Sequence, residues 1–90
     1  MPTLALRGAE VLAAALDHLV RGIVDNPDDV QVDQVSSRRG RRMEVRVHPD
    51  DLGKVIGRGG RTARALRTVV GAVAGGRGPR IDFLDVDEVR

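Results

Sequence analysis

Residues 53–62 of the chain read GKVIGRGGRT, and the interpretation of the whole sequence starts from this stretch. One glycine would be enough to turn the chain, because glycine adopts left-handed backbone conformations without strain. Three glycines within four positions predict that something approaches the main chain closely, and the surrounding cations indicate that it is anionic. These residues are Gly57, Gly59 and Gly60, with Lys54, Arg58 and Arg61 around them.

Helical patterns on both sides of the glycines predict a tight helix–turn–helix unit over about residues 50–74. Pro49-Asp50-Asp51 is typical of a helix start, and Gly57 ends this short first helix. The second helix begins near Gly60, and its exposed N–H groups form a ready anion site. Its predicted buried face consists of Leu66, Val69, Val70 and Val73.

Arginines follow the glycine turn at three-residue steps, at Arg61, Arg64 and Arg67, nearly opposite the predicted buried face. Arg61 opposes the helix dipole, and a chain of phosphates would relieve this conflict and the mutual repulsion of the arginines. The spacing excludes a Walker loop, because Lys54 precedes the turn, and it excludes a dinucleotide fingerprint, because Thr62 replaces the last glycine. The pattern therefore favours a phosphate polymer over a bound nucleotide.

The remaining elements complete a single α+β domain over residues 1–90. An amphipathic helix is predicted at about 8–24, a strand hairpin at about 30–48, and a last strand at about 80–86. Leu84 and Val86 depart from strict alternation in that strand, which suggests a bulge. The predicted order is α-β-β-α-α-β, with a three-stranded sheet and the helices packed on one face.

Charge is separated along the chain although the net charge is only +2. Residues 36–80 hold twelve basic and three acidic side chains, whereas residues 1–35 hold two against six and residues 81–90 one against four. A basic block between acidic ends is typical of a protein that meets a polyanion. Cysteine is absent, no secretion signal is recognisable, and apolar runs are short, so we expect a soluble cytoplasmic protein.

Val55 to Arg61, reading VIGRGGR, resembles the I-G-x-x-G signature of KH domains, whose GXXG loop clamps the backbone of about four nucleotides. The element order is that of the type II, prokaryotic KH fold. More narrowly, the run DLGKVIGRGGRTARALRTVV is similar to the small bacterial single-KH-domain proteins of the KhpA family. The resemblance covers nearly the whole chain.

This resemblance implies a site of Gly57, Arg58, Gly59 and Gly60 at the sugar–phosphate backbone. Because Gly59 has no side chain, one possible contact with RNA is lost, and we do not expect a strong preference for a particular RNA sequence. The bases would lie between the helix pair and a neighbouring strand, for which the candidate is 43–47. The remaining implied RNA-binding residues are Lys54, Val55, Ile56, Arg61 and Arg64.

The resemblance also implies partners. KhpA-like proteins associate with themselves and with KhpB, a larger multi-domain KH protein, as an RNA chaperone that affects cell-envelope growth and cell length. Phe83, the single aromatic residue, is expected in the core, so base stacking on aromatic rings is not available. Affinity should therefore rest on phosphates and depend on salt, and pairing would strengthen it.

Several alternatives stay open. The basic loop of Arg38, Arg39, Arg41 and Arg42 is either an auxiliary RNA contact or a solvated turn. The whole chain could instead be a dimerisation or docking subunit for a larger RNA-binding partner, with little RNA contact of its own. Duplex DNA binding is disfavoured because the second helix lacks Asn or Gln for base edges. No carboxylate pair or metal-ligand cluster is recognisable, so we expect no enzyme, metal or cofactor.

Overall fold

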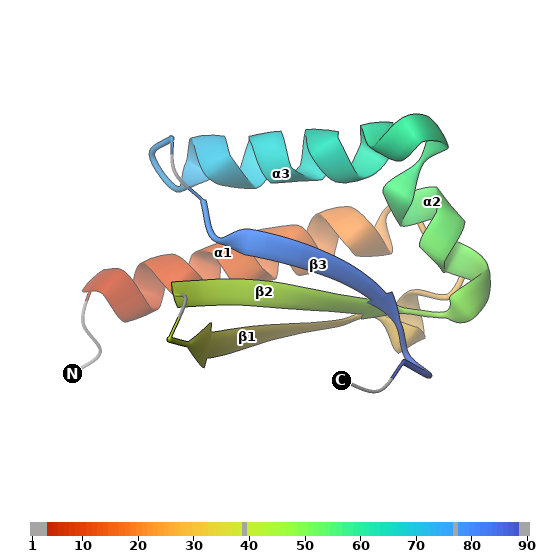
Figure 1. Ribbon diagram of the computed structural model, residues 1–90, viewed down its shortest axis with the longest axis horizontal. Coiled ribbons are helices and arrows are strands. Elements are labelled where there is room, and N and C mark those ends of the chain that lie inside the picture. Colours follow the sequence, from red (N-terminus) through yellow and green to blue (C-terminus); the bar gives the residue numbers. More distant parts are fainter. Residues whose placement is uncertain (1–3, 39, 77, 89–90) are drawn as a thin grey trace.

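The computed structural model describes residues 4–38, 40–76 and 78–88, with the side chains of residues 4–7, 9 and 37 left undescribed. The order of elements is α-β-β-α-α-β, as predicted, and Figure 1 shows how they are arranged. Short 3-10 turns precede β1, α2 and α3 at Pro27–Asp29, Pro49–Asp51 and Arg58–Gly60. The main elements are α1 (Leu4–Arg21), β1 (Gln31–Ser37), β2 (Gly40–Val47), α2 (Leu52–Ile56), α3 (Arg61–Val73) and β3 (Arg80–Asp85).

The three strands form one mixed sheet in the order β1-β2-β3. β1 and β2 pair antiparallel, with Val32 opposite Val45, whereas β2 and β3 run parallel, with Val45 opposite Phe83. A parallel pair needs a long crossover, and the α2–α3 unit supplies it. β3 therefore becomes an edge strand beside the helix pair, and β2 lies at the centre of the sheet.

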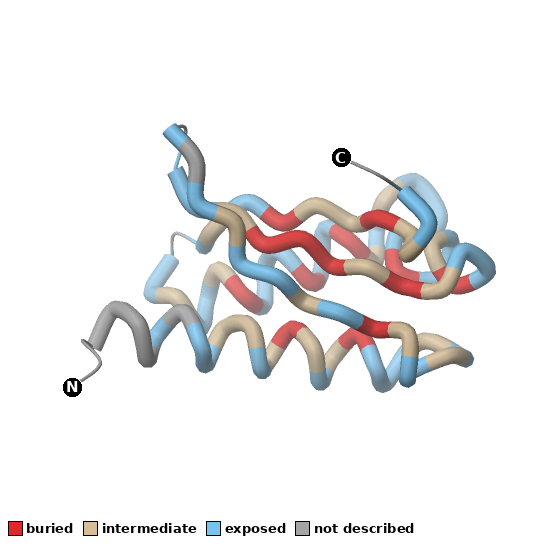
Figure 2. The backbone as a smooth tube through the Cα atoms, turned by 90° about the horizontal axis from the view of Figure 1, so that it is seen from below, coloured by how far each residue is buried: buried red, intermediate tan, exposed pale blue. Residues whose placement is uncertain are grey.

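The core lies between one face of the sheet and the helices. Met43, Val45 and Val47 alternate along β2 and turn this face toward Leu16 and Val20 of α1. Figure 2 shows the buried residues concentrated where the sheet meets the helices. From α3, the core takes Leu66 and Val70. Among the described residues this is a small aliphatic core, completed by Val30, Val55 and Ile81.

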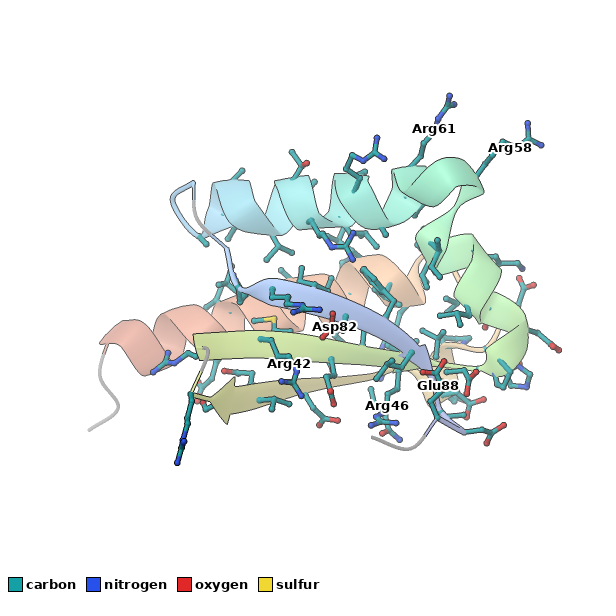
Figure 3. The ribbon with its side chains drawn as sticks, viewed as in Figure 1. Arg42, Arg46, Arg58, Arg61, Asp82 and Glu88 are labelled. Carbon is teal, nitrogen blue, oxygen red and sulfur yellow. The ribbon has the colours of Figure 1, made fainter. Side chains whose placement is uncertain are left out.

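The other face of the sheet carries a network of ion pairs (Figure 3). The carboxylate of Glu44, whose side chain is only 8% exposed, lies 3.3 Å from Arg42 Nη2 and 3.7 Å from Arg46 Nη2. Arg42 Nε faces Asp82 Oδ2 at 3.7 Å, and neither buried atom has a hydrogen-bond partner. Arg46 Nη1 donates to the main-chain carbonyl of Glu88 at 2.7 Å and so ties the segment after β3 to the sheet.

Element boundaries differ from the sequence prediction in instructive ways. α1 spans Leu4–Arg21 instead of 8–24. Its last residue, Arg21, bonds to Asp17 and donates to the carbonyls of Pro27 and Val30, so it ties the helix end to the segment that leads into β1. The predicted basic loop is shorter than expected, since β1 reaches Ser37 and β2 begins at Gly40, so that Arg41 and Arg42 lie in a strand. Backbone pairing in the hairpin thus extends through polar residues that the sequence pattern assigned to a loop.

The predicted bulge in the last strand and the predicted burial of Val69 and Val73 are both wrong. The register of β2 with β3 runs without interruption from Arg42 opposite Arg80 to Val47 opposite Asp85, so there is no bulge. Leu84 lies beside Arg46 on the polar face and is still only 3% exposed. On α3, Val69 and Val73 belong to the solvent side, with exposures of 46% and 55%.

Candidate nucleic-acid interface

The three loop glycines have different reasons to be glycine. Gly57 has φ 75° and ψ 171°, a combination open in practice only to glycine. A Cβ on Gly57 would lie 2.4 Å from Thr62 Oγ1 and 2.9 Å from Thr62 N. The close approach at Gly57 is therefore made by the first turn of α3 within the chain, and the sequence argument for an external ligand does not apply to it.

Gly59 and Gly60 leave space outside the loop. Both have positive φ, of 62° and 78°, and a Cβ on either would meet no atom within 4 Å. Gly60 is the N-cap of α3, and no side chain caps the helix there. The N-terminal amides of α3, at the positive end of its dipole, thus open onto a surface that a ligand backbone can approach.

Arginines surround this open surface. Arg58 and Arg61 are exposed and project outward from the loop (Figure 3), and within the described residues no carboxylate lies at ion-pair distance from them. Arg64, one turn further on, donates from Nη2 to the Gly59 carbonyl at 3.4 Å. The loop therefore combines accessible main chain with uncompensated positive charge.

The side chain of Lys54 already has an acidic partner within the chain. Its ammonium pairs with the Asp25 carboxylate, across the junction between α1 and β1. The hydrogen bond that Lys54 donates to Asp25 raises the pKa of Lys54 above its ordinary value and outweighs the opposing effect of desolvation. Unlike Arg58 and Arg61, this predicted phosphate contact would have to leave an acidic partner first.

Asp51 is buried and stabilises the same junction between α1 and β1 through hydrogen bonds. It is only 1% exposed, and its carboxylate accepts hydrogen bonds from the main-chain N–H of Asp25, at 3.3 Å, and of Asn26, at 2.9 Å. Burial alone would raise the pKa of Asp51, but the side chain and backbone of Asn26, the backbone of Asp25 and the charge of Lys54 hold it below 3.8. Sequence reasoning placed Asp51 only at a helix start and missed this role.

The two apolar residues before the loop differ in exposure. Val55 is fully buried in the core, whereas Ile56 is 37% exposed. Only Ile56 can present an apolar side chain to a ligand directly, and Val55 supports the loop from beneath. Consecutive residues of a helix point about 100° apart, and here Val55 turns toward the core while Ile56 turns toward solvent.

The basic hairpin is remote from the loop. Figure 1 places the β1–β2 turn and the α2–α3 junction at opposite ends of the domain. Arg38 and Arg41 are exposed, and Arg39 lies outside the described residues. Arg42 lies within β2 and pairs with Glu44 and Asp82, so it is part of the sheet network.

The strand beside the helix pair is β3. The predicted candidate, 43–47, is the central strand and is covered by the core. Both α2 and α3 pack beside β3. Arg67 joins α3 to this strand by donating from Nη2 to the Ile81 carbonyl at 3.1 Å, and its guanidinium lies 5.4 Å from the centre of the Phe83 ring. Arg67 was visible in the sequence as part of the arginine stripe but was not assigned to the site.

The described residues contain no helix that is both long and apolar enough to cross a membrane. They also bring no three His, Asp or Glu side chains together in a way that would hold a metal ion.

The fold and the glycine loop together define a type II KH domain. A family model described as "KhpA/KhpB, KH domain" matches residues 13–83, and the chain belongs to this family.

Named relatives cover nearly the whole chain. RNA-binding protein KhpA of Streptomyces coelicolor is 75% identical over 80 residues, which are 89% of this chain and 100% of that protein. RNA-binding protein KhpA of Mycobacterium tuberculosis H37Rv is 69% identical over 78 residues, 87% of this chain and 96% of the relative. The protein of the same name from Halalkalibacterium halodurans is 47% identical over 72 residues, 78% and 95% of the two chains. No solved structure matches the chain.

Proposed function

We propose that this chain is a non-catalytic protein that grips single-stranded RNA through its GXXG loop, Gly57–Gly60. The observation that carries the proposal is the open, uncapped start of α3, where Gly59 and Gly60 leave the main chain accessible between two arginines that have no acidic partner among the described residues. The names of the relatives, RNA-binding protein KhpA, support RNA as the ligand.

Each part of the loop has a distinct task in this proposal. The amides at the start of α3 face phosphate oxygens, and Arg58 and Arg61 neutralise phosphate charge. Ile56 offers an apolar surface to a base. Phe83 is already covered by Arg67, so an aromatic stacking platform is not provided there. We therefore expect weak binding per domain, a strong salt dependence and little sequence preference.

A charge-reversal experiment tests the proposal. The double variant Arg58→Asp/Gly59→Asp should lose retention of a single-stranded RNA in fluorescence anisotropy while its circular dichroism spectrum stays unchanged. The control is Arg38→Asp/Arg41→Asp at the opposite end of the domain, which removes more positive charge. Unaltered RNA binding by the loop variant, or an equal loss in both variants, would contradict a site at the loop.

The proposal extends to pairing and to an RNA-chaperone role. Val69 and Val73 lie four residues apart on one face of α3 and are exposed, and α1, which packs beside α3, exposes Val11. Such apolar side chains support self-association or pairing with a KhpB-like multi-domain KH protein, and the chaperone activity would follow from many weak contacts. An effect on cell-envelope growth and cell length would act through the bound RNAs. A cytoplasmic location accords with an RNA ligand.

The exposed valines also favour the second candidate function, a docking subunit with little RNA contact of its own. The two candidates separate in one comparison. If Arg58→Asp/Gly59→Asp abolishes RNA retention and leaves the oligomeric state unchanged, the loop acts directly on RNA. If it changes neither while a valine variant changes both, docking is the main function.

A further inference from the structure

The cations around the GXXG loop are not equally available to a ligand. Arg58 and Arg61 have no acidic partner among the described residues, whereas the ammonium of Lys54 pairs with the carboxylate of Asp25. Lys54 lies in α2, shortly before Gly57, and Asp25 lies 29 positions away in the sequence, between α1 and β1. One cation beside the loop is therefore already bound by another part of the chain.

The backbone on both sides of this ion pair is fixed. The buried carboxylate of Asp51, the N-cap of α2, accepts hydrogen bonds from the main-chain N–H of Asp25 at 3.3 Å and of Asn26 at 2.9 Å. Figure 1 shows the segment after α1 running beside α2. Because the backbone that carries Asp25 is bonded to the start of the helix that carries Lys54, the two charged side chains meet without the ordering of a free loop.

The ion pair is open to solvent and can be exchanged. The side chain of Lys54 is 44% exposed and that of Asp25 is 74% exposed. An exposed pair is weak and is screened by salt, so a phosphate can compete for the ammonium. The exchange would still break one ion pair and leave the Asp25 carboxylate beside an anionic strand, and like charges repel. Both effects oppose a contact between Lys54 and RNA.

A released Lys54 side chain can reach a strand that is held by the loop. The N–H of Gly57 donates to the Gly53 carbonyl at 2.8 Å, so the helical turn that carries Lys54 continues to the first residue of the loop. The three residues from Lys54 to Gly57 rise about 4.5 Å along the helix. Lysine carries its charge on a flexible four-carbon stem, which covers this distance.

We infer that Asp25 restrains RNA binding at the GXXG loop by holding Lys54 away from the strand, and that loss of the Asp25 charge adds Lys54 as a further phosphate contact. This inference rests on the proposed function and adds a means of regulating it. A cationic side chain of a partner protein that pairs with Asp25 has the same effect as removal of the charge. Docking of such a partner would therefore tighten the grip on RNA.

A double-mutant cycle tests the inference on the full chain, with a fluorescein-labelled oligouridylate of nine nucleotides followed by fluorescence anisotropy at several salt concentrations. Asp25→Asn removes the charge and keeps the main-chain N–H that Asp51 accepts. We expect Asp25→Asn to tighten binding at least about threefold and to steepen the slope of log K against log salt by about 0.7, the contribution of one phosphate contact on a single strand. Asp25→Ser, a second neutral substitution, should give the same gain.

Two further comparisons separate release of Lys54 from a general effect of charge. Asp28→Asn makes the same charge change at an exposed position nearby and should leave the salt slope unchanged. In a Lys54→Gln background, Asp25→Asn should raise affinity no more than Asp28→Asn does in the wild type. Circular dichroism of each variant should match that of the wild type.

The inference is overturned if neither Asp25 variant binds RNA more tightly, if Asp28→Asn gives an equal gain, or if the gain persists in the Lys54→Gln background. The loop proposal survives each of these results as long as Arg58→Asp/Gly59→Asp loses RNA retention. If Arg58→Asp/Gly59→Asp instead binds the RNA like wild type, the proposed function fails and this inference fails with it.

Discussion

At the scale of single residues, the glycine turn divides into a packed residue and two open ones. Gly57 is fixed by Thr62 inside the chain, whereas Gly59 and Gly60 bend the backbone under free space. The sequence shows three glycines but cannot distinguish these two roles. A position that needs glycine to avoid an internal clash and a position that needs glycine to admit a ligand have the same residue type.

Substitution by alanine should separate these two roles. Gly59→Ala introduces a left-handed alanine, which costs about 1–2 kcal/mol, and meets no neighbouring atom. Gly57→Ala adds a collision with Thr62 to the same kind of strain and should lower the free energy of unfolding by more. Urea denaturation followed by circular dichroism measures both losses. Equal losses would mean that the first turn of α3 yields freely to the new methyl group.

The buried carboxylate of Asp51 makes the stability of the domain depend on pH. Because the pKa of Asp51 is lowered on folding, its contribution to stability is full at a pH above 3.8 and is lost as the pH falls through the lower, folded value. Asp51→Asn should therefore lower the melting temperature by several degrees at pH 7. The difference from wild type should shrink toward pH 3.

The matched control is Asp50→Asn, one residue earlier, where the side chain is 86% exposed. Differential scanning calorimetry at pH 7, 5 and 3 follows all three proteins. A gap between wild type and Asp51→Asn that is the same at every pH would indicate a defect of shape and not of charge.

At the scale of elements, periodicity predicted which segments are helices and strands but not what covers them. The pattern of α3 placed Leu66, Val69, Val70 and Val73 on one buried face, and the domain has room to bury only the first and third of these. Periodicity also did not predict the order of the strands in the sheet. Alternation identified 43–47 as a strand, and only the parallel crossover shows that Arg80–Asp85 is the edge strand beside the helix pair.

Side-chain partners across the sheet and across loops were also beyond the sequence. Arg42 was predicted as a hairpin cation and Lys54 as a phosphate contact, yet each has an acidic partner remote in the sequence, Asp82 and Asp25. The distribution of charge along the sequence identified the basic block of residues 36–80. It did not show which basic side chains in this block pair with acidic residues in the folded protein, because such pairs depend on strand register and on how α2 meets the end of α1.

The exposed valines of α3 lead to a prediction about assembly. Val69→Asp places a charge on the apolar face and should convert a self-associated form to monomer in sedimentation equilibrium, with the helical signal unchanged. Gln31→Asp on the polar side of the sheet is the control and should sediment like wild type. If the wild-type chain is monomeric at every concentration, the valines serve a different partner, and self-association is excluded as the source of tighter RNA binding.

At the scale of the whole molecule, the domain is elongated, with extents of 38 × 25 × 24 Å, and its two basic regions lie at opposite ends (Figure 1). A stacked tetranucleotide is only about 14 Å long. It can touch the GXXG loop or the β1–β2 turn but not both. This separation turns the open question about Arg38 and Arg41 into a measurable one.

Salt dependence distinguishes a localised site from diffuse attraction to the basic block. Neutralising Arg58 and Arg61 together by alanine should reduce the slope of log K against log salt for a tetranucleotide by about 1.4, since each phosphate contact on a single strand contributes about 0.7. Arg38→Ala/Arg41→Ala removes the same charge at the other end and should leave that slope unchanged. Equal reductions in the two variants would mean that the block attracts RNA through its summed charge alone, because a bound strand of this length cannot reach both ends at once.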